Sequence, residues 1–268
     1  MQIVYLLRSG GKDDYERLMD NVGWMEFLRY PKHNLELRIA EQNSNRDRVG
    51  LSNQQWFTHQ APQGENLYGL SPDKHPNIKY ICIVRNGREV VRSFFPFVNA
   101  INDQMRDLWG GFPPRMDTPQ SALEMMITTA PDFYFGHAES WYAWRRQPNV
   151  LLLHFADVLK DRKGAVSKIA RFLGIELKGG LLDVVLAKSS HSYMQARPEK
   201  FVNHAGYPGR TFVNVEQGKH IRKGGGRVDG APEFFTADMN AQWEAAVKRY
   251  WGDKPGLAEW ALNGGDLR

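Results

Sequence analysis

Cysteine is almost absent from this chain of 268 residues, in which only Cys82 occurs. A single cysteine excludes an intramolecular disulfide and any zinc site built from several cysteines. Cys82 lies inside an apolar segment, which favours a packed thiol over a reactive one. The sequence also lacks a run of about 18 to 20 apolar residues, so no membrane-spanning helix is expected. The opening MQIVYLL has neither the basic segment nor the cleavage site of a signal peptide. We therefore expect a cytoplasmic protein, or one of a similar reducing compartment.

Runs of basic residues are lacking as well, although the net charge is +5 and the pI is near 9.2. Scattered Lys and Arg side chains suit an anionic small ligand better than a nucleic acid. No pair among the eight histidines has the spacing of a convincing metal site, so no metal is expected. The apolar and charged fractions, 42% and 24%, are typical of a globular protein with a substantial core.

Two apolar runs, 78–84 and 150–155, each follow a Pro-Asn pair and predict parallel strands that are buried on both faces. Residues 176–235 are rich in glycine and basic residues, and they read as irregular. Apolar spacing and breaker residues predict helices over 1–8, 121–130, 137–146, 161–173 and from 236 onward. Strand, helix, strand and helix in this order predict one α/β domain, residues 1–268, with a central parallel sheet flanked by helices.

The segment KYICIVRNGREVVRSFF, residues 79–95, joins the first strand to a helix. Asn86 and Glu89 have the spacing of a capping box, which predicts a helix that begins at Gly87. The turn would then lie at the carboxyl edge of the sheet, where open parallel sheets bind their ligands. A guanidinium from Arg85 and a hydroxyl from Ser93 would suit a phosphate group there. The alternative is that Arg85 only pairs with a neighbouring carboxylate, and this segment alone does not decide between the two.

Four motifs, in order along the chain, resemble those of cytosolic-type sulfotransferases that use 3′-phosphoadenosine 5′-phosphosulfate (PAPS). RNGREVVRSFF resembles RNPxDVxxSxx, and WYAWRRQPNVLLLHFADVLKD resembles WWxxR followed by VLxLxYEDMxxD. GKHIRKGGG resembles the FxRKGxxG loop, and FFTADMNAQWE resembles the FTxxxNxxF helix that follows it. The resemblance runs from about residue 56 to 245. It implies a P-loop-NTPase-like sulfotransferase fold and sulfuryl transfer from PAPS to a hydroxyl or amine of a small acceptor.

The resemblance assigns cofactor contacts at the matching positions. Arg85 and Ser93 would bind the 3′-phosphate. Arg222 and the backbone of Lys223 and Gly224 would close on it from the other side, since glycine allows close approach and cations neutralise a dianion. Phe155 would stack on the adenine and would lack the hydroxyl contact of the tyrosine that the family has there. An RKGGG stretch on its own would more often be a solvated loop.

The resemblance also implies a catalytic base, His59, within QQWFTHQAP at the place of KTHxP. The base takes the proton from the acceptor during in-line transfer, and imidazole suits that role because it titrates near neutrality. Two other histidines, His137 and His154, lie near site segments. Phe57 replaces a lysine of the family, which removes a cation near the transferring group. His220 replaces an aromatic residue before RKG.

A larger departure concerns the region before the first helix. In the family a strand and a PK[SA]GTTW loop wrap the 5′-phosphosulfate, whereas this chain has neither that loop nor GxxxxGK[ST]. MQIVYLLRSGG resembles the later part of the helix after the loop. Either upstream residues are missing from the printed sequence, or the protein is a degenerate descendant. Loss of a buried strand would leave backbone groups unpaired, which favours the first explanation.

Two other function classes are weighed against the enzyme. A binding or scaffold protein would keep the 3′-phosphate grip without the chemistry, and a nucleotide kinase is disfavoured by the missing Walker lysine and metal-binding aspartate. The aromatic segments LWGGFPP and FYFGHAESWYAW could be pocket walls or core. The expected ligands are PAPS, its product adenosine 3′,5′-bisphosphate (PAP) and a small-molecule acceptor, with no nucleic acid, membrane or metal. A homodimer is left open.

Overall fold

The structure is a computed structural model that describes residues 1–62, 69–215, 221 and 234–267. The chain folds into two compact units, each assembled from three separate stretches of sequence. Unit 1 comprises residues 1–58, 97–115 and 175–226, and unit 2 comprises residues 59–96, 116–174 and 227–268. Each unit draws on distant stretches of the chain, so neither corresponds to one continuous segment of the sequence. The single domain over 1–268 therefore stays a prediction.

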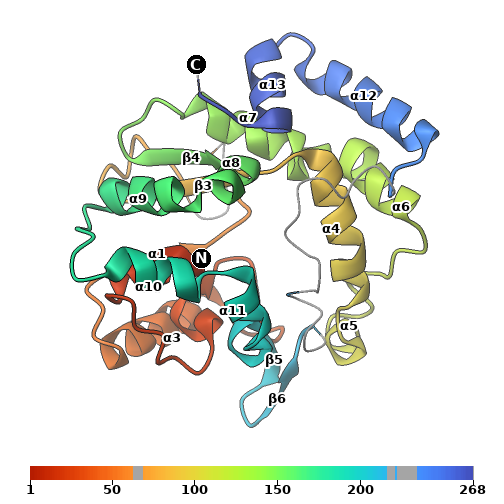
Figure 1. Cartoon of the computed structure of the whole chain (residues 1–268). Coiled ribbons are helices and arrows are strands. Elements are labelled where there is room, and N and C mark those ends of the chain that lie inside the picture. The colour runs from red at the N-terminus through yellow and green to blue at the C-terminus, as the bar shows by residue number, and fades with distance from the viewer. Residues whose placement is uncertain (63–68, 216–220, 222–233, 268) are drawn as a thin grey trace. The chain divides into compact units, whose positions relative to one another are not determined.

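Unit 2 contains the parallel pair of strands that the two apolar runs predict. β3 (Tyr80–Val84) pairs with β4 (Val150–His154) residue for residue, and the two strands lie side by side in Figure 1. β4 is buried along its whole length, whereas Ile83 of β3 is 48% exposed. The prediction of burial on both faces is therefore confirmed for β4 and wrong for β3. Cys82 is buried, and burial raises the pKa of its thiol, as a packed cysteine requires.

The helices of unit 2 mostly begin and end at the predicted signals. Asp161 accepts a hydrogen bond from Gly164 N at 2.8 Å at the start of α9, and Gly174 ends that helix in the left-handed conformation with a φ of 73°. Thr236 caps α12 in the same way as Asp161 caps α9. The helical elements of the unit are α4 (Gly87–Asn99, whose end belongs to unit 1), α6 (Pro119–Glu124), η1 (Met125–Thr129), η2 (Pro131–Phe133), α7 (Phe135–Ala143), α8 (Phe155–Lys160), α9 (Arg162–Leu173), α12 (Ala237–Trp251) and α13 (Pro255–Asn263).

Aromatic side chains form the core of unit 2. The ring of Phe135 lies 5.4 Å from that of Trp243 and 4.8 Å from that of Trp251, between centroids. Both tryptophans are buried. The segment FYFGHAESWYAW therefore contributes largely to the core, and Phe133 is the exposed aromatic residue within it. In Figure 1, α13 follows α12 and lies against α7, so the last two helices cover this aromatic cluster.

Unit 1 has a separate small core around Tyr5, Tyr15 and Val22. The prediction that 176–235 is irregular is wrong for its first part, which contains two helices and an antiparallel hairpin. The elements of the unit are α1 (Gln2–Arg8), α2 (Leu18–Asn21), β1 (Gly23–Trp24), α3 (Leu35–Arg48), β2 (Trp56–Phe57), α5 (Asp103–Leu108), α10 (Leu181–Lys188), α11 (His191–Gln195), η3 (Pro198–Phe201), β5 (His204–Tyr207) and β6 (Arg210–Val213). Among the residues that the structure describes, no helix has the length and apolar content needed to cross a bilayer.

Candidate functional site

The turn between β3 and α4 is fixed by hydrogen bonds on both sides. Asn86 Oδ1 accepts from Arg88 N at 3.0 Å, and Asn86 Nδ2 donates to the carbonyl of Leu262 at 2.8 Å. The hydroxyl of Tyr134 donates to the carbonyl of Arg85 at 3.0 Å. The predicted capping role is confirmed for Asn86. It is wrong for Glu89, because the carboxylate of Glu89 contacts guanidinium groups instead.

Arg85, Glu89 and Arg92 form what we call the α4 cluster. Arg85 Nη2 lies 2.9 Å from Glu89 Oε2, and Arg92 reaches the same oxygen with Nη2 at 2.8 Å. The Glu89 side chain is only 3% exposed, whereas those of Arg85 and Arg92 are 18% and 23% exposed. The carboxylate is therefore covered while both cations reach solvent. With two guanidinium groups and one carboxylate, the α4 cluster carries a net charge of +1.

Phe155 lies beside the α4 cluster. The guanidinium carbon of Arg85 is 4.6 Å from the centre of the Phe155 ring, which is a cation–π distance. Arg85 directly follows β3 and Phe155 directly follows β4, so the parallel pairing of the strands brings the two side chains together. Ser93 is partly buried and follows Arg92 on α4, and helical periodicity places both on the side that carries Glu89. A cation and an aromatic ring thus meet at the carboxyl edge of the sheet.

Three predicted contacts, Arg222, Lys223 and Gly224, lie outside the described residues, as does His220. Phe57 belongs to unit 1, where its ring lies 5.4 Å from that of Trp24. Its side chain packs against the small core of that unit.

His59 lies in unit 2 and is exposed. Its ring centre is 5.9 Å from that of Phe133, which in turn lies 5.6 Å from Phe94 on α4. Because Phe94 follows Ser93, a chain of aromatic contacts connects the predicted base to the helix that carries the predicted phosphate contacts. The carbonyl of Gln60, the next residue, accepts a hydrogen bond from the Trp141 indole at 3.3 Å, which anchors the segment to α7.

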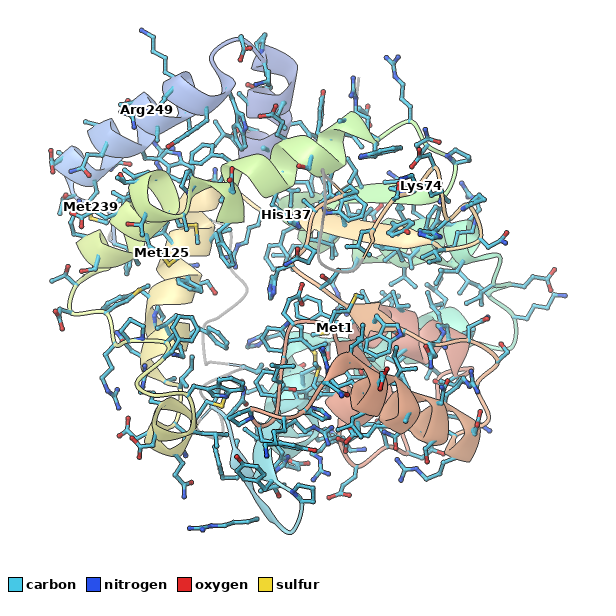
Figure 2. The ribbon with its side chains drawn as sticks, turned by 180° about the vertical axis from the view of Figure 1, so that it is seen from behind. Met1, Lys74, Met125, His137, Met239 and Arg249 are labelled. Carbon is cyan, nitrogen blue, oxygen red and sulfur yellow. The ribbon has the colours of Figure 1, made fainter. Side chains whose placement is uncertain are left out.

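Two further histidines of unit 2 have pKa values lowered by burial. For His137, labelled on α7 in Figure 2, burial and then the charge of His59 lower the pKa to about 4. His137 is therefore neutral at pH 7, and the effect of His59 indicates that the two rings are near each other. His154 is structural: Nδ1 accepts from Ala156 N at 3.4 Å, which leaves the proton on Nε2 to donate to the Ala261 carbonyl at 3.2 Å.

Gly87 departs from the RNP of the family motif, and its surroundings give a reason. A Cβ at this position would lie 2.0 Å from Cη2 of Trp243 and 2.7 Å from Cε1 of Tyr134. The first turn of α4 thus packs its backbone directly on the indole of α12. Sequence reasoning did not identify Trp243 as a support of the site, because nothing in its own helix indicates which segment it contacts.

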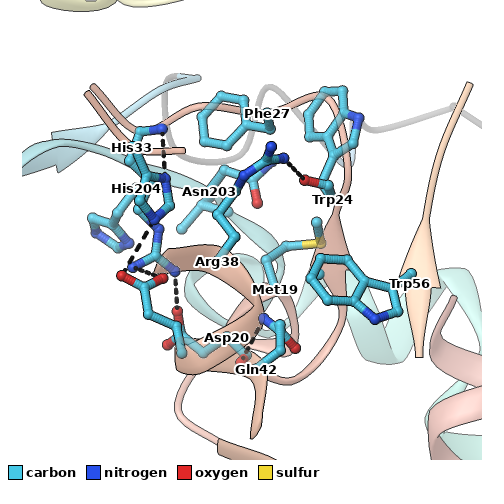
Figure 3. A pocket seen from close by; sticks show the side chains of 14 residues that line it. Met19, Asp20, Trp24, Phe27, His33, Arg38, Gln42, Trp56, Asn203 and His204 are labelled. Atoms are coloured by element: carbon cyan, nitrogen blue, oxygen red, sulfur yellow. Dashed lines mark hydrogen bonds and ion pairs between the residues drawn. The ribbon is translucent and has the colours of Figure 1, made fainter. Parts of the chain in front are cut away.

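A small cavity of about 30 Å³ in unit 1 was not expected from the sequence. Its wall includes Asp20 and His33, which are labelled in Figure 3. Glu41 lies 3.3 Å from His33 and 3.5 Å from Arg29, and Arg29 also pairs with Asp20 at 3.3 Å. Burial lowers the pKa of His33, although the Glu41 charge opposes this. The cavity has room for about one or two water molecules, and its charges are already paired, so it is no substrate site.

The described residues contain no group of three His, Cys, Asp or Glu side chains that could hold a metal ion. The described part of the site offers two guanidiniums, a carboxylate, aromatic rings and imidazoles. An arrangement of this kind can bind an anion beside a planar ring and can accept a proton.

An α/β fold with a cation and an aromatic ring at the ends of its strands is typical of α/β proteins that bind an anionic ligand. Within that class, residues 15–254 match the family model described as "Sulfotransferase domain", and the chain belongs to this family. The resemblance inferred from the four motifs is thereby confirmed.

Individual relatives are similar over part of their length. Sulfotransferase 1B1 of the dog, Canis lupus familiaris, is 27% identical over 176 residues, which cover 65% of this chain and 54% of the relative. Amine sulfotransferase of the rabbit, Oryctolagus cuniculus, is 23% identical over 73% of this chain and 62% of its own length. In these two matches the chain spans between half and two thirds of the relative's own length.

Solved structures confirm the predicted fold. Mouse sulfotransferase SULT7A1, solved as a complex with PAP, superposes with a TM-score of 0.62 over 97% of this chain and 83% of its own, at 17% identity. Retinol dehydratase, solved with androsterone and PAP, gives a TM-score of 0.60 over 94% of this chain and 76% of its own, also at 17% identity. Likeness at this level of identity supports the fold alone.

Proposed function

We propose that this chain is a PAPS-dependent sulfotransferase that transfers a sulfuryl group to a hydroxyl or amine of a small, partly apolar acceptor. The observation that carries the proposal is the contact between the Arg85 guanidinium and the Phe155 ring at the ends of β3 and β4. This is the pair that a nucleotide with a 3′-phosphate and an adenine ring would require. Membership of the sulfotransferase family supports the same cofactor.

In this proposal each side chain has a defined role toward the nucleotide. Arg85 and Ser93 bind the 3′-phosphate, and Phe155 offers its ring to the adenine. Arg222 and the backbone of Lys223 and Gly224 complete the phosphate site. The guanidinium groups supply positive charge to the 3′-phosphate, so the proposal assigns no metal to that phosphate.

His59 acts as the base. It accepts the proton of the acceptor hydroxyl or amine while the new bond to sulfur forms and the bond between sulfur and the phosphate oxygen of PAPS breaks, and PAP departs. The rings of Phe133 and Phe94 beside His59 offer an apolar surface to the acceptor. We place this activity in the cytoplasm, where a lone buried thiol such as Cys82 stays reduced.

The direct test is calorimetric titration of the full-length protein with PAP. We expect Arg85→Ala to weaken PAP binding by about tenfold or more, since a lost hydrogen bond to a charged group costs roughly 1.5–3 kcal/mol. Arg171→Ala is the matched control, because Arg171 is an exposed arginine on α9 of the same unit. Equal affinity for PAP in the wild type and in Arg85→Ala would contradict the phosphate site. PAP binding without sulfuryl transfer from PAPS would favour the scaffold alternative.

A further inference from the structure

Arg92 is a second arginine of the α4 cluster that the motif resemblance does not assign. It contacts Glu89 Oε2 with two nitrogens, Nη2 at 2.8 Å and Nε at 3.2 Å. Arg85, which precedes α4, contacts the same oxygen with Nη2 at 2.9 Å. The buried carboxylate therefore holds the guanidinium groups of Arg85 and Arg92 close together, and neither guanidinium is fully buried.

The charge balance of the cluster depends on Arg92. Glu89 cancels the charge of one guanidinium, so Arg85 and Glu89 alone would present an ion pair with no net charge to a ligand. Arg92 restores a net charge of +1, which a dianionic ligand needs if it is to leave water for this site. Ser93, the neighbouring residue on α4, adds a hydroxyl.

Arg88 lies on the same helix but outside the α4 cluster, so it serves as a comparison for Arg92. Its Nε donates to Asn240 Oδ1 at 3.0 Å, and its Nη2 lies 3.2 Å from Glu244 Oε1, so it is directed to α12. Its charge is paired with a carboxylate of its own. Arg88 and Arg92 thus lie on the same helix, but Arg88 contacts residues of α12 and Arg92 contacts Glu89.

We propose that Arg92 is a further binding residue for the 3′-phosphate. Glu89 is the positioning residue that holds the guanidinium groups of Arg85 and Arg92 side by side. This inference rests on the proposed function, because it concerns the same phosphate. On binding, the phosphate oxygens accept hydrogen bonds from both guanidinium groups, while Glu89 keeps its contact with both side chains.

The test compares variants of the full-length protein by calorimetric titration with PAP. Arg92→Ala should weaken PAP binding by about tenfold or more, Arg92→Lys should give an intermediate loss, and Arg88→Ala should bind as the wild type does. Arg92→Ala should also make binding less sensitive to added NaCl, since one screened charge is gone. The lysine variant keeps a cation beside Glu89, so it tests the proposal even if the alanine variant folds poorly.

Two simpler nucleotides locate the effect. Adenosine 3′-monophosphate should bind Arg92→Ala more weakly than the wild type, as PAP does. Adenosine 5′-monophosphate should bind the two proteins equally. Wild-type PAP affinity in both Arg92 variants would overturn the inference, and so would a loss for PAP that adenosine 3′-monophosphate does not share. If the wild-type protein fails to bind PAP at all, the proposed function itself is wrong.

Discussion

His59 has the surroundings of a residue that can meet a second molecule. Its ring is exposed, and its described neighbours are an aromatic ring at 5.9 Å and a histidine that burial keeps neutral. A base that accepts a proton from a second molecule has to be accessible to that molecule. The exposure of the His59 side chain therefore supports its proposed role as the base.

Replacement of His59 should separate turnover from binding. We expect His59→Ala to lower the rate of sulfuryl transfer from PAPS to 2-naphthol by about 10²- to 10⁴-fold, because a positioned base contributes about that much. PAP affinity should be unchanged, since His59 is not in the α4 cluster. The measurement is a steady-state rate together with a PAP titration, and His75→Ala is the control at another exposed histidine of unit 2. Retained turnover would exclude His59 as the base.

The sequence identified Arg85 by its position directly after a buried strand, and the structure places it at that strand end. It did not identify Arg92 as a partner of the same carboxylate, because the predicted helix start at Gly87 does not show which side chains Glu89 contacts. Phe155 became part of the site through strand pairing. The remaining cofactor contacts and the base have no direct test in the structure, and they stay predictions.

At the scale of elements, local capping signals predicted the bounds of α9, but they did not lead to prediction of α3 and α5, which Asn34 and Asn102 cap. Asp161 and Gly174 bound α9 as expected, because a cap and a left-handed glycine act locally. Helix α10 was missed because it follows Gly179–Gly180 and lacks a side-chain cap, so only its packing indicates it. The five-residue π-helical turn at Met125–Thr129 has no local sequence signal.

The contact between α4 and α12 gives a prediction for Gly87. Gly87→Ala places a methyl group in the space of the Trp243 indole, so we expect a loss of about 1–3 kcal/mol in the free energy of unfolding. Urea denaturation checks this value. Trp243→Phe removes the outer indole atoms that the methyl group meets, so the second substitution should cost less in the Gly87→Ala background than alone. Additive costs would mean that the two residues do not interact.

For the whole molecule, burial of histidines in both units makes stability depend on pH. The pKa is lowered by burial, as the largest cause, for His33, His137, His154 and His204. A histidine with a lowered folded pKa binds its proton more readily in the unfolded chain. The stabilisation is therefore complete above the unfolded pKa of about 6.5 and is lost as the pH falls toward the folded value.

His137 allows this dependence to be measured at one position. With a folded pKa of about 4, it should cost the protein about 1 kcal/mol between pH 7.5 and 5.5. Thermal unfolding midpoints at these two pH values should therefore differ less for His137→Gln than for the wild type. His75→Gln, at an exposed histidine, should keep the wild-type difference. An unchanged pH difference in His137→Gln would show that His137 does not titrate in this range.

The last turn of α13 is hydrogen-bonded to the ends of both strands of unit 2. Its carbonyls, which a helix end leaves without partners, accept hydrogen bonds from Asn86 after β3 and from His154 at the end of β4. The backbone N–H of Gly265 then donates to Asp157 on α8 at 2.8 Å. The end of α13 and Gly265 thus connect the ends of β3 and β4 with helix α8, so a substitution that removes these bonds would disturb the positions of Arg85 and Phe155, which follow the two strands.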